Sequence, residues 1–316
     1  MLTRRNQLMF KKLVAVALFA AISTAVMAKD FKLILPNPAG SSSDIVARAV
    51  ADEFARQNPG DNLVLDYAPG GEHLVAVNKF KTQTDLTVIL GTTTMHVFNH
   101  VTKPDLPYKD SEFSHATWIG WSPHIWYTSA NSKYKTIGDF NDALNRGDKI
   151  NAGVDALSTQ ANAMSVQRFH KNGGKLTMVK YKGSPQTLAA VMGGEVEIGN
   201  SSISTAIIEA AKAGKIVILS TTHNSPVKID DLPEIPVGAK TLGVQQFNGG
   251  FLISIGSQYA DSAEGKAMKA KLINVVKSDS VKETLAKIRI QVEPMTSEST
   301  TKMLNEYRDT VSVLVK

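Results

Sequence analysis

Strand-like and helix-like segments alternate over most of this sequence, and that alternation limits the folds that the chain can adopt. Short runs rich in β-branched and other apolar residues are separated by longer segments in which apolar residues recur every three or four positions. Alternating strands and helices predict an α/β fold with a largely parallel sheet. The strands are expected at residues 31–35, 63–66, 87–90, 150–153, 177–180 and 216–220.

Helices are expected between these strands and near the C-terminus. The run Thr136-Ile-Gly-Asp139 is typical of a helix start, because a threonine cap is followed three residues later by an acid. Two amphipathic segments close the chain. The predicted helices cover residues 45–54, 74–80, 159–170, 187–192, 204–213, 266–277 and 297–314.

Two β-rich passages interrupt the alternation. The first, residues 116–129, is divided at Ser122-Pro123, and the second, residues 246–255, follows the proline-rich loop 229–236. Such passages on either side of an α/β block indicate connections that leave one lobe and later return to it. We therefore expect a first lobe made of residues 29–125 plus 226–316 and a second lobe made of residues 126–225.

The first predicted strand leads through a serine-rich turn into a helix. Two prolines end the strand, Gly40 permits a tight turn, and Ser41 to Asp44 open the helix. A helix start leaves N–H groups unpaired at the positive end of the macrodipole, where they can bind an anion. Serine and aspartate are also ordinary helix caps, so an anion site and a plain cap are both open interpretations.

The first 28 residues have the organisation of an export signal. Four Lys and Arg residues come before an apolar run, residues 13–22, and small residues lead to Ala28. Ten apolar residues are too few to span a bilayer as a helix. We expect cleavage after Ala28 and a periplasmic location.

Removal of that segment changes the charge balance. Residues 1–28 hold four basic and no acidic residues, so the rest has 31 Lys and Arg against 29 Asp and Glu, a net charge of +2 instead of +6. Since no basic stripe is interleaved with aromatic residues, nucleic acid is not expected as a partner. The absence of cysteine excludes disulfides and thiolate metal ligands.

Several short motifs occur in a particular order. The first is Pro36-Asn-Pro-Ala-Gly-Ser-Ser-Ser-Asp44 with Arg48, and the second is Tyr67-Ala-Pro-Gly-Gly71. The third is Tyr181-Lys-Gly-Ser184, a short helix and Gly193-Gly-Glu-Val196, and Leu232-Pro-Glu-Ile-Pro236 comes later. Their order and spacing carry a resemblance that covers nearly all of the mature chain. The chain resembles the periplasmic substrate-binding receptors of tripartite tricarboxylate transporters, the Bug or TctC proteins.

The resemblance implies a two-lobed α/β periplasmic binding protein, similar to type II, which closes about a hinge like a Venus flytrap. Such a receptor is not an enzyme: it captures a small organic carboxylate and delivers it to integral membrane transporter subunits. We expect a monomer that needs no cofactor and no metal. Asn37, Ser41, Asp155 and Asn200 depart from the family pattern, which leaves the identity of the ligand open.

The expected ligand-binding residues follow strand ends, where open α/β sheets bind ligands. Their hydroxyl and N–H groups can donate hydrogen bonds to a carboxylate without a buried counter-charge. Asp44 is expected to organise its turn by accepting backbone N–H groups, since an acid repels a bound carboxylate. The set comprises Gly40, Ser41, Ser42, Ser43, Asp44, Thr92, Thr93 and Thr94 from the first lobe, and Leu157, Ser158, Thr159, Tyr181, Gly183 and Ser184 from the second.

Two other functions are weaker alternatives. One is a secreted hydrolase with an unrecognised Ser/His arrangement, although the Gly-x-Ser-x-Gly nucleophile motif is absent and residues 252–256 lack its first glycine. The other is a receptor that senses its ligand and signals to a partner. The clustered Trp118, Trp121 and Trp126 either stack on an aromatic ligand or pack in the core.

A metal site is disfavoured. His96 and His100 are four residues apart and would share a helix face, but Val97 stands where the zinc-protease motif has glutamate. No acidic residue adjoins the pair in sequence. His96 is expected to pack at the start of a helix near the cleft.

Overall fold

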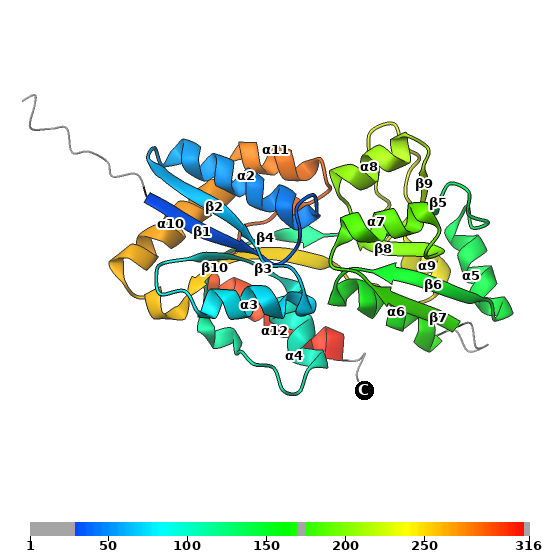
Figure 1. The fold of residues 1–316 in the computed structure, drawn as a ribbon, viewed down its shortest axis with the longest axis horizontal. Coiled ribbons are helices and arrows are strands. Elements are labelled where there is room, and N and C mark those ends of the chain that lie inside the picture. Colours follow the sequence, from blue (N-terminus) through cyan, green and yellow to red (C-terminus); the bar gives the residue numbers. More distant parts are fainter. Residues whose placement is uncertain (1–28, 170–174, 313–316) are drawn as a thin grey trace, which may run out of the picture.

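The chain forms two lobes, each built on one β-sheet (Figure 1). The structure is a computed structural model, and it describes residues 29–169 and 175–312. The predicted export signal, residues 1–28, lies outside this described part. No helix within the described ranges is long and apolar enough to cross a membrane.

The first lobe contains a six-stranded sheet with the order β11-β4-β10-β3-β1-β2. Its strands are β1 (Lys29–Leu35), β2 (Asp61–Tyr67), β3 (Val88–Thr92), β4 (Phe113–Ser122), β10 (Gly249–Gly256) and β11 (Gln291–Val292). β1 is parallel to β2 and β3, whereas β10 is antiparallel to β3 and β4. Leu33, Ile34 and Leu35 are fully buried because helices cover both faces of the sheet at β1.

Two sets of helices cover this sheet. On one face lie α2 (Ser42–Gln57), α10 (Ala263–Lys277) and α11 (Asp279–Ala286), whose apolar residues share one core with Leu33 and Leu35. On the other face, α3 (Leu74–Lys81) packs against Ile34, and α12 (Ser297–Val311) contacts β4. The π-helical segment η2 (Thr94–Phe98) and the short α4 (Asn99–Thr102) follow β3 on this second face.

The second lobe contains a five-stranded sheet with the order β7-β6-β8-β5-β9. Its strands are β5 (His124–Ser129), β6 (Lys149–Val154), β7 (Lys175–Lys180), β8 (Ile198–Ser202) and β9 (Ile216–Thr221). β6 is parallel to β7 and β8, and β5 is antiparallel to β8 and β9. The helices are α5 (Ile137–Arg146), α6 (Leu157–Phe169), α7 (Ser184–Gly193), α8 (Thr205–Lys212) and α9 (Gly238–Leu242).

The expected elements are found, with one difference in strand direction. Every predicted strand overlaps an observed one, and Thr136 caps α5 through a hydrogen bond from Asp139 N to its hydroxyl. Both sheets are mixed rather than largely parallel, because β5 and β10 enter antiparallel to their neighbours. These are the strands at which the chain changes lobe. The proposed lobe boundaries at residues 125 and 225 stay predictions, and α9, which lies beyond residue 225, packs against α5 and β9 of the second lobe.

Candidate functional site

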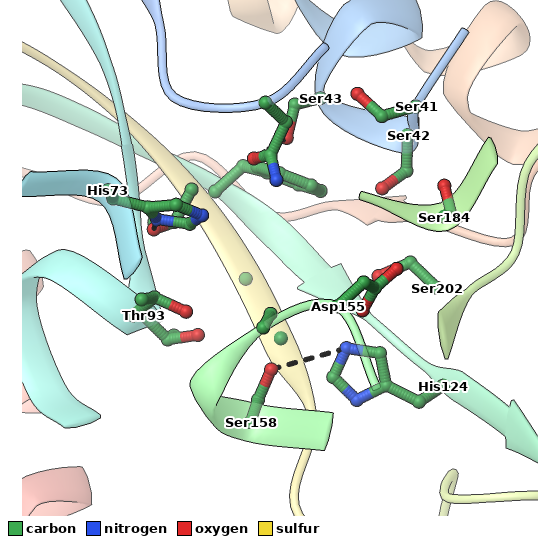
Figure 2. Close-up of a pocket in the computed structure, with 17 residues that line it drawn as sticks. Ser41, Ser42, Ser43, His73, Thr93, His124, Asp155, Ser158, Ser184 and Ser202 are labelled. Atoms are coloured by element: carbon green, nitrogen blue, oxygen red, sulfur yellow. Dashed lines mark hydrogen bonds between the residues drawn. The ribbon is translucent and has the colours of Figure 1, made fainter. Parts of the chain in front are cut away.

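A small polar pocket lies where the two lobes face one another (Figure 2). The volume of the pocket that is open to water is about 30 Å³. A single water needs roughly 10–15 Å³ by this measure, so the two walls lie close together. The pocket is lined by Asn37, Ser41, Ser42, Ser43, His73, Thr92, Thr93, Thr94, His124, Asp155, Ala156, Ser158, Ser184, Ser202, Gly249, Gly250 and Phe251.

The start of α2 supplies one wall. Ser41 is the N-cap, and its hydroxyl donates to the Pro38 carbonyl at 2.7 Å and accepts from Asp44 N at 3.4 Å. The N–H groups of Ser42 and Ser43 lie in the first turn and have no carbonyl four residues earlier within the helix. They are therefore available to an anion in the pocket, at the positive end of a helix of 16 residues.

Asp44 organises this turn, as expected, from behind the pocket wall. Its carboxylate accepts the Gly40 N–H at 2.8 Å and the Tyr67 hydroxyl at 2.6 Å, and Arg48 Nε lies 2.9 Å away. Burial acts to raise the pKa of Asp44, but these hydrogen bonds outweigh it and lower the pKa. Gly40 has a φ of +79°, a left-handed conformation that favours glycine.

Two helix starts of the second lobe face α2 across the pocket. Ser158 lies in the first turn of α6, and Ser184 is the first residue of α7. The Ser184 hydroxyl is buried and has no hydrogen-bond partner among the residues that the structure describes. A buried hydroxyl without a partner costs free energy, so Ser184 is a ready donor for a ligand.

His73 and the threonines after β3 form a further side. The His73 Nδ1 lies 2.9 Å from the Thr92 hydroxyl, while its Nε2 is buried and has no partner among the described residues. Burial lowers the pKa of His73 to about 4, so the ring is neutral near pH 7. His73 itself has a φ of +75°, and this strained turn directs the ring into the pocket.

His124 and Ser158 form a pair at the base of the pocket (Figure 2). The His124 Nδ1 lies 3.1 Å from the Phe247 carbonyl oxygen, which can only accept, so Nδ1 carries the proton. Nε2 is then an acceptor, 3.4 Å from the Ser158 hydroxyl. Burial lowers the pKa of His124 to about 4.

Asp155 is the acidic residue of the lining. The Thr159 hydroxyl lies 3.3 Å from its carboxylate but only 2.7 Å from the Ala156 carbonyl, and the backbone N–H of Asp155 donates to this hydroxyl at 3.0 Å. No Lys or Arg is among the described residues that line the pocket. Burial without a counter-charge raises the pKa of Asp155 to about 7.

The lobes touch above the pocket at two glycines. A Cβ on Gly183 would lie 2.8 Å from Pro38 Cδ, and one on Gly40 would lie 3.7 Å from Pro185 Cγ. Glycine at 183 therefore lets the α7 start approach the turn before α2. The donor groups of α2 and α7 consequently face one space.

Comparison with known proteins places the chain in a family. A family model described as "Tripartite tricarboxylate transporter family receptor" matches residues 46–316. The chain belongs to this receptor family. A curated relative, Protein BugT of Bordetella pertussis, is 24% identical over 229 residues, covering 70% of this chain and 68% of BugT.

Solved structures share the fold of this receptor. Rpa4515 of R. palustris with adipate has a TM-score of 0.78 at 19% identity, covering 90% of this chain and 96% of that one. MatC of Rhodopseudomonas palustris with bound malate has a TM-score of 0.76 at 17% identity, covering 91% and 99%. BugD, a periplasmic binding protein, has a TM-score of 0.77 at 12% identity, covering 90% and 96%. The two-lobed periplasmic binding protein fold is therefore confirmed.

The structure brings eight of the fourteen expected ligand residues to the pocket. These are Ser41, Ser42, Ser43, Thr92, Thr93, Thr94, Ser158 and Ser184. Three further residues support the pocket wall from behind. The Gly40 N–H donates to the Asp44 carboxylate, and the Thr159 hydroxyl accepts the N–H groups of residues 155 and 156. Gly183 caps α7, and the Tyr181 hydroxyl donates to Glu195 at 2.8 Å instead of facing the pocket. Leu157 begins α6, and its side chain is outside the described part.

Sequence reasoning missed several lining residues of this receptor. Nothing local marks His73 or His124, because each reaches the pocket through a backbone turn or an antiparallel strand. The pair Gly249-Gly250 is a sequence signal for a place where other groups approach the backbone closely. A Cβ on Gly249 would lie 3.0 Å from His124 Nε2, and one on Gly250 would lie 2.2 Å from the Trp118 ring.

The tryptophans pack in the core and do not face the pocket. Trp118 and Trp126 are fully buried. The rings of Trp118 and Trp121 are 4.9 Å apart, and Trp126 packs against Phe140. Trp121 is half-buried, and no tryptophan is among the described residues that line the pocket, so the core-packing interpretation is the one that fits.

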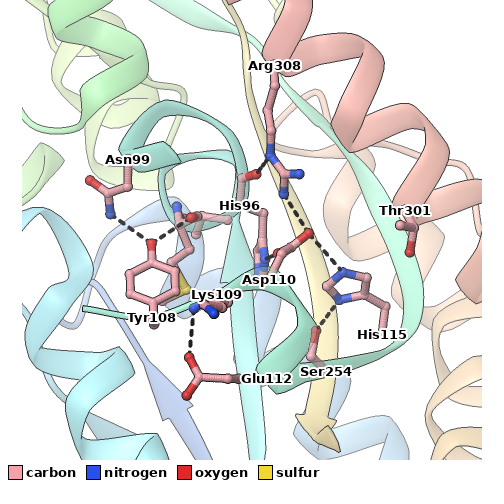
Figure 3. Close-up of polar contacts among 12 residues, drawn as sticks. His96, Asn99, Tyr108, Lys109, Asp110, Glu112, His115, Ser254, Thr301 and Arg308 are labelled. Atoms are coloured by element: carbon pink, nitrogen blue, oxygen red, sulfur yellow. Dashed lines mark hydrogen bonds and ion pairs between the residues drawn. The ribbon is translucent and has the colours of Figure 1, made fainter. Parts of the chain in front are cut away.

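His96 lies away from the pocket, in a buried charge cluster (Figure 3). Its Nδ1 is 2.5 Å from the Asp110 carboxylate, and His115 Nε2 is 3.9 Å from the same group. His96 packs in the helical segment after β3, as expected, but it does not line the pocket, and the loop after α4 brings it an acidic partner, Asp110. Arg308 of α12 also pairs with Asp110 at 2.5 Å, so a guanidinium already neutralises this carboxylate.

Proposed function

We propose that the chain is an exported periplasmic receptor that captures a small organic carboxylate and delivers it to the membrane subunits of a tripartite tricarboxylate transporter. The observation that carries this proposal is the convergence of the α2, α6 and α7 starts on one pocket without Lys or Arg. The related structures hold adipate and malate, which are small organic carboxylates. The unpartnered Ser184 hydroxyl supplies a further donor.

The energetics require several donors and closure of the lobes. A charge at one helix start gains about 0.3–1 kcal/mol when exposed and up to ~2 kcal/mol when partly buried. Micromolar affinity needs about 8 kcal/mol. Hydrogen bonds to a charged group, at roughly 1.5–3 kcal/mol each, supply the remainder when both walls contact the ligand.

A ligand larger than a few atoms enters this pocket only when the lobes separate. The bridged, closed form is then favoured by the difference in ligand affinity between the open and closed forms. Small-angle scattering is expected to show a smaller radius of gyration with saturating ligand than without. An unchanged radius, with binding confirmed by calorimetry, contradicts the closure.

The Ser158–His124 pair favours binding over hydrolysis. A serine nucleophile needs a base that becomes an imidazolium, and a carboxylate on the far ring nitrogen stabilises that cation. Here the far nitrogen bonds the Phe247 carbonyl, and burial lowers the pKa of His124 to about 4. We therefore propose a receptor without catalytic activity.

The test is a panel of mono-, di- and tricarboxylates and aromatic acids, each beside its amide, measured by thermal shift and calorimetry. At ~100 times its dissociation constant, a ligand stabilises the protein by about 2.7 kcal/mol, which gives a visible shift. Amides that bind as tightly as acids overturn the carboxylate assignment.

Export is tested by mass spectrometry of the intact periplasmic protein. Its mass is expected to correspond to a chain that begins at Lys29, and full-length protein found only in the cytoplasm contradicts export.

A further inference from the structure

The pocket has two sides of opposite hydrogen-bonding character. One side consists of donors: the first-turn N–H groups of Ser42 and Ser43 and the free Ser184 hydroxyl. The other side holds acceptors, the Asp155 carboxylate and the neutral His124 Nε2. In Figure 2, Ser42 and Ser43 lie at the top, and Asp155 and His124 lie below them.

The acceptor side is unsuited to an anion. Asp155 has no Lys or Arg partner among the described residues that line the pocket. The His124 ring is held in the tautomer that offers a lone pair at Nε2, because Nδ1–H donates to Phe247 O. A second carboxylate placed here would face the Asp155 carboxylate and the lone pair of His124, and two carboxylates that share one site repel each other.

We propose that the ligand is amphoteric, with a carboxylate held by the α2 and α7 starts and a cationic nitrogen paired with Asp155. This inference rests on the proposed function and specifies its substrate class as amino acids or similar zwitterions. Asp155 is then the residue that determines specificity, with Ser158 and His124 beside it.

The local structure holds Asp155 ready for that pairing. Thr159 Oγ1 accepts the N–H groups of Asp155 and Ala156 at 3.0 and 2.9 Å, which fixes the loop between β6 and α6. Burial raises the pKa of Asp155 to about 7, and no Lys or Arg among the described lining residues offsets the negative charge. A ligand ammonium supplies that missing cation, and a hydrogen bond between two charged groups is among the stronger ones.

Calorimetry near neutral pH with matched ligand pairs tests the proposal. Each pair shares a carbon skeleton and differs at one position: glutarate with glutamate, adipate with 2-aminoadipate, and malate with aspartate. At least one amino acid is expected to bind the wild type about tenfold or more tightly than its partner, which corresponds to about 1.4 kcal/mol. In Asp155→Asn that preference is expected to fall to within about threefold.

Asp85→Asn is the matched control. It removes the same charge from an exposed site before the start of β3, whereas the pocket is at the other end of that strand. It is expected to keep the wild-type preference. Thermal unfolding without ligand shows whether Asp155→Asn is folded, and if it is not, the wild-type preference alone decides.

The outcomes separate this inference from the proposed function. Partner acids without an ammonium group that bind the wild type as tightly as the amino acids, or a preference that survives Asp155→Asn, overturn the role of Asp155 and leave the carboxylate function standing. Acids and amino acids that bind no better than their amides overturn both.

Discussion

The Glu72 carboxylate of the first lobe lies 3.0 Å from Lys180 Nζ of the second. Gln160 of α6 also donates to Glu72, at 3.2 Å, and Lys103 pairs with it at 2.5 Å. Glu72 and His73 both have positive φ, 53° and 75°. One strained turn therefore has two effects: it directs the Glu72 carboxylate to the second lobe, and it directs the His73 side chain into the pocket.

Glu72→Gln is expected to weaken ligand binding by about two- to fivefold, since partly exposed ion pairs contribute about 0.2–1 kcal/mol. The loss comes from the closed form, in which Glu72 contacts Lys180 and Gln160. Calorimetry with the best acid of the panel measures it. Glu195→Gln is the control, because Glu195 contacts Tyr181 within the second lobe. Equal affinities for the two variants contradict a bridging role.

The same contact predicts a dependence on pH. Burial acts to raise the pKa of Glu72, but hydrogen bonds from Lys103, Lys180 and Gln160 outweigh it and lower the pKa from 4.5 to about 2. A lowered pKa means that the contribution is complete above pH 4.5 and is lost as the pH falls toward 2. Scattering without ligand is expected to show lobe opening in this window for the wild type, and a smaller change for Glu72→Gln.

The sequence predicted the α2 wall because its signals are local. Gly40 before a run of serines indicates a tight turn and a helix cap, and the structure has both. Ser41 needs no left-handed conformation, since its φ is −77°, so serine in place of the family's glycine causes no strain. Strand and helix periodicity likewise depends on neighbouring residues, which explains why the elements were located.

The acceptor side could not be predicted in the same way. His124 reaches the pocket because β5 is antiparallel to β8 and β9, and periodicity does not encode strand direction. Asp155 was recognised as a departure from the family pattern, but its isolation from Lys and Arg is a property of the folded pocket. His73 depends on two positive φ values at residues other than glycine, which no sequence rule anticipates.

Arg308→Gln is expected to destabilise the protein by about 1–3 kcal/mol, because the partly buried Asp110 carboxylate loses one of its partners but keeps His96 and His115. Arg308 pairs with Asp110 and donates to the His96 carbonyl at 2.6 Å, which attaches α12 to the first lobe. Burial acts to raise the pKa of Asp110, but His115, His96 and Arg308 together lower it well below its usual range. Urea unfolding measures the loss. Lys302→Gln, an exposed change on the same helix, is expected to stay within about 0.5 kcal/mol.

Ser184→Ala is expected to have opposite effects on the empty and the loaded protein. Its hydroxyl has no partner within the described part of the chain, so removal leaves the unliganded stability unchanged or slightly higher. Loss of a donor to a carboxylate costs about 1.5–3 kcal/mol, or roughly 10- to 150-fold in affinity. Ser165→Ala removes another buried, unpartnered hydroxyl outside the pocket, and its affinity is expected to match the wild type. If Ser184→Ala binds the ligand with wild-type affinity, Ser184 is not part of the binding site.

Gly183→Ala tests whether close approach of the lobes is needed for binding. Gly183 is extended, with a φ of 176°, so alanine fits its backbone and the effect is steric. The added Cβ would lie 2.8 Å from Pro38 Cδ, a ring carbon fixed to the backbone of the facing lobe, so the two walls must move apart. Wider separation weakens every hydrogen bond that spans the pocket, and the expected loss is about tenfold or more in affinity with little change in unliganded stability. Gly193→Ala at the end of the same helix meets nothing within 4 Å and serves as the control. Calorimetry on both variants decides: equal affinities mean that ligand is held by one lobe alone, and a loss confined to Gly183→Ala means that both walls hold it.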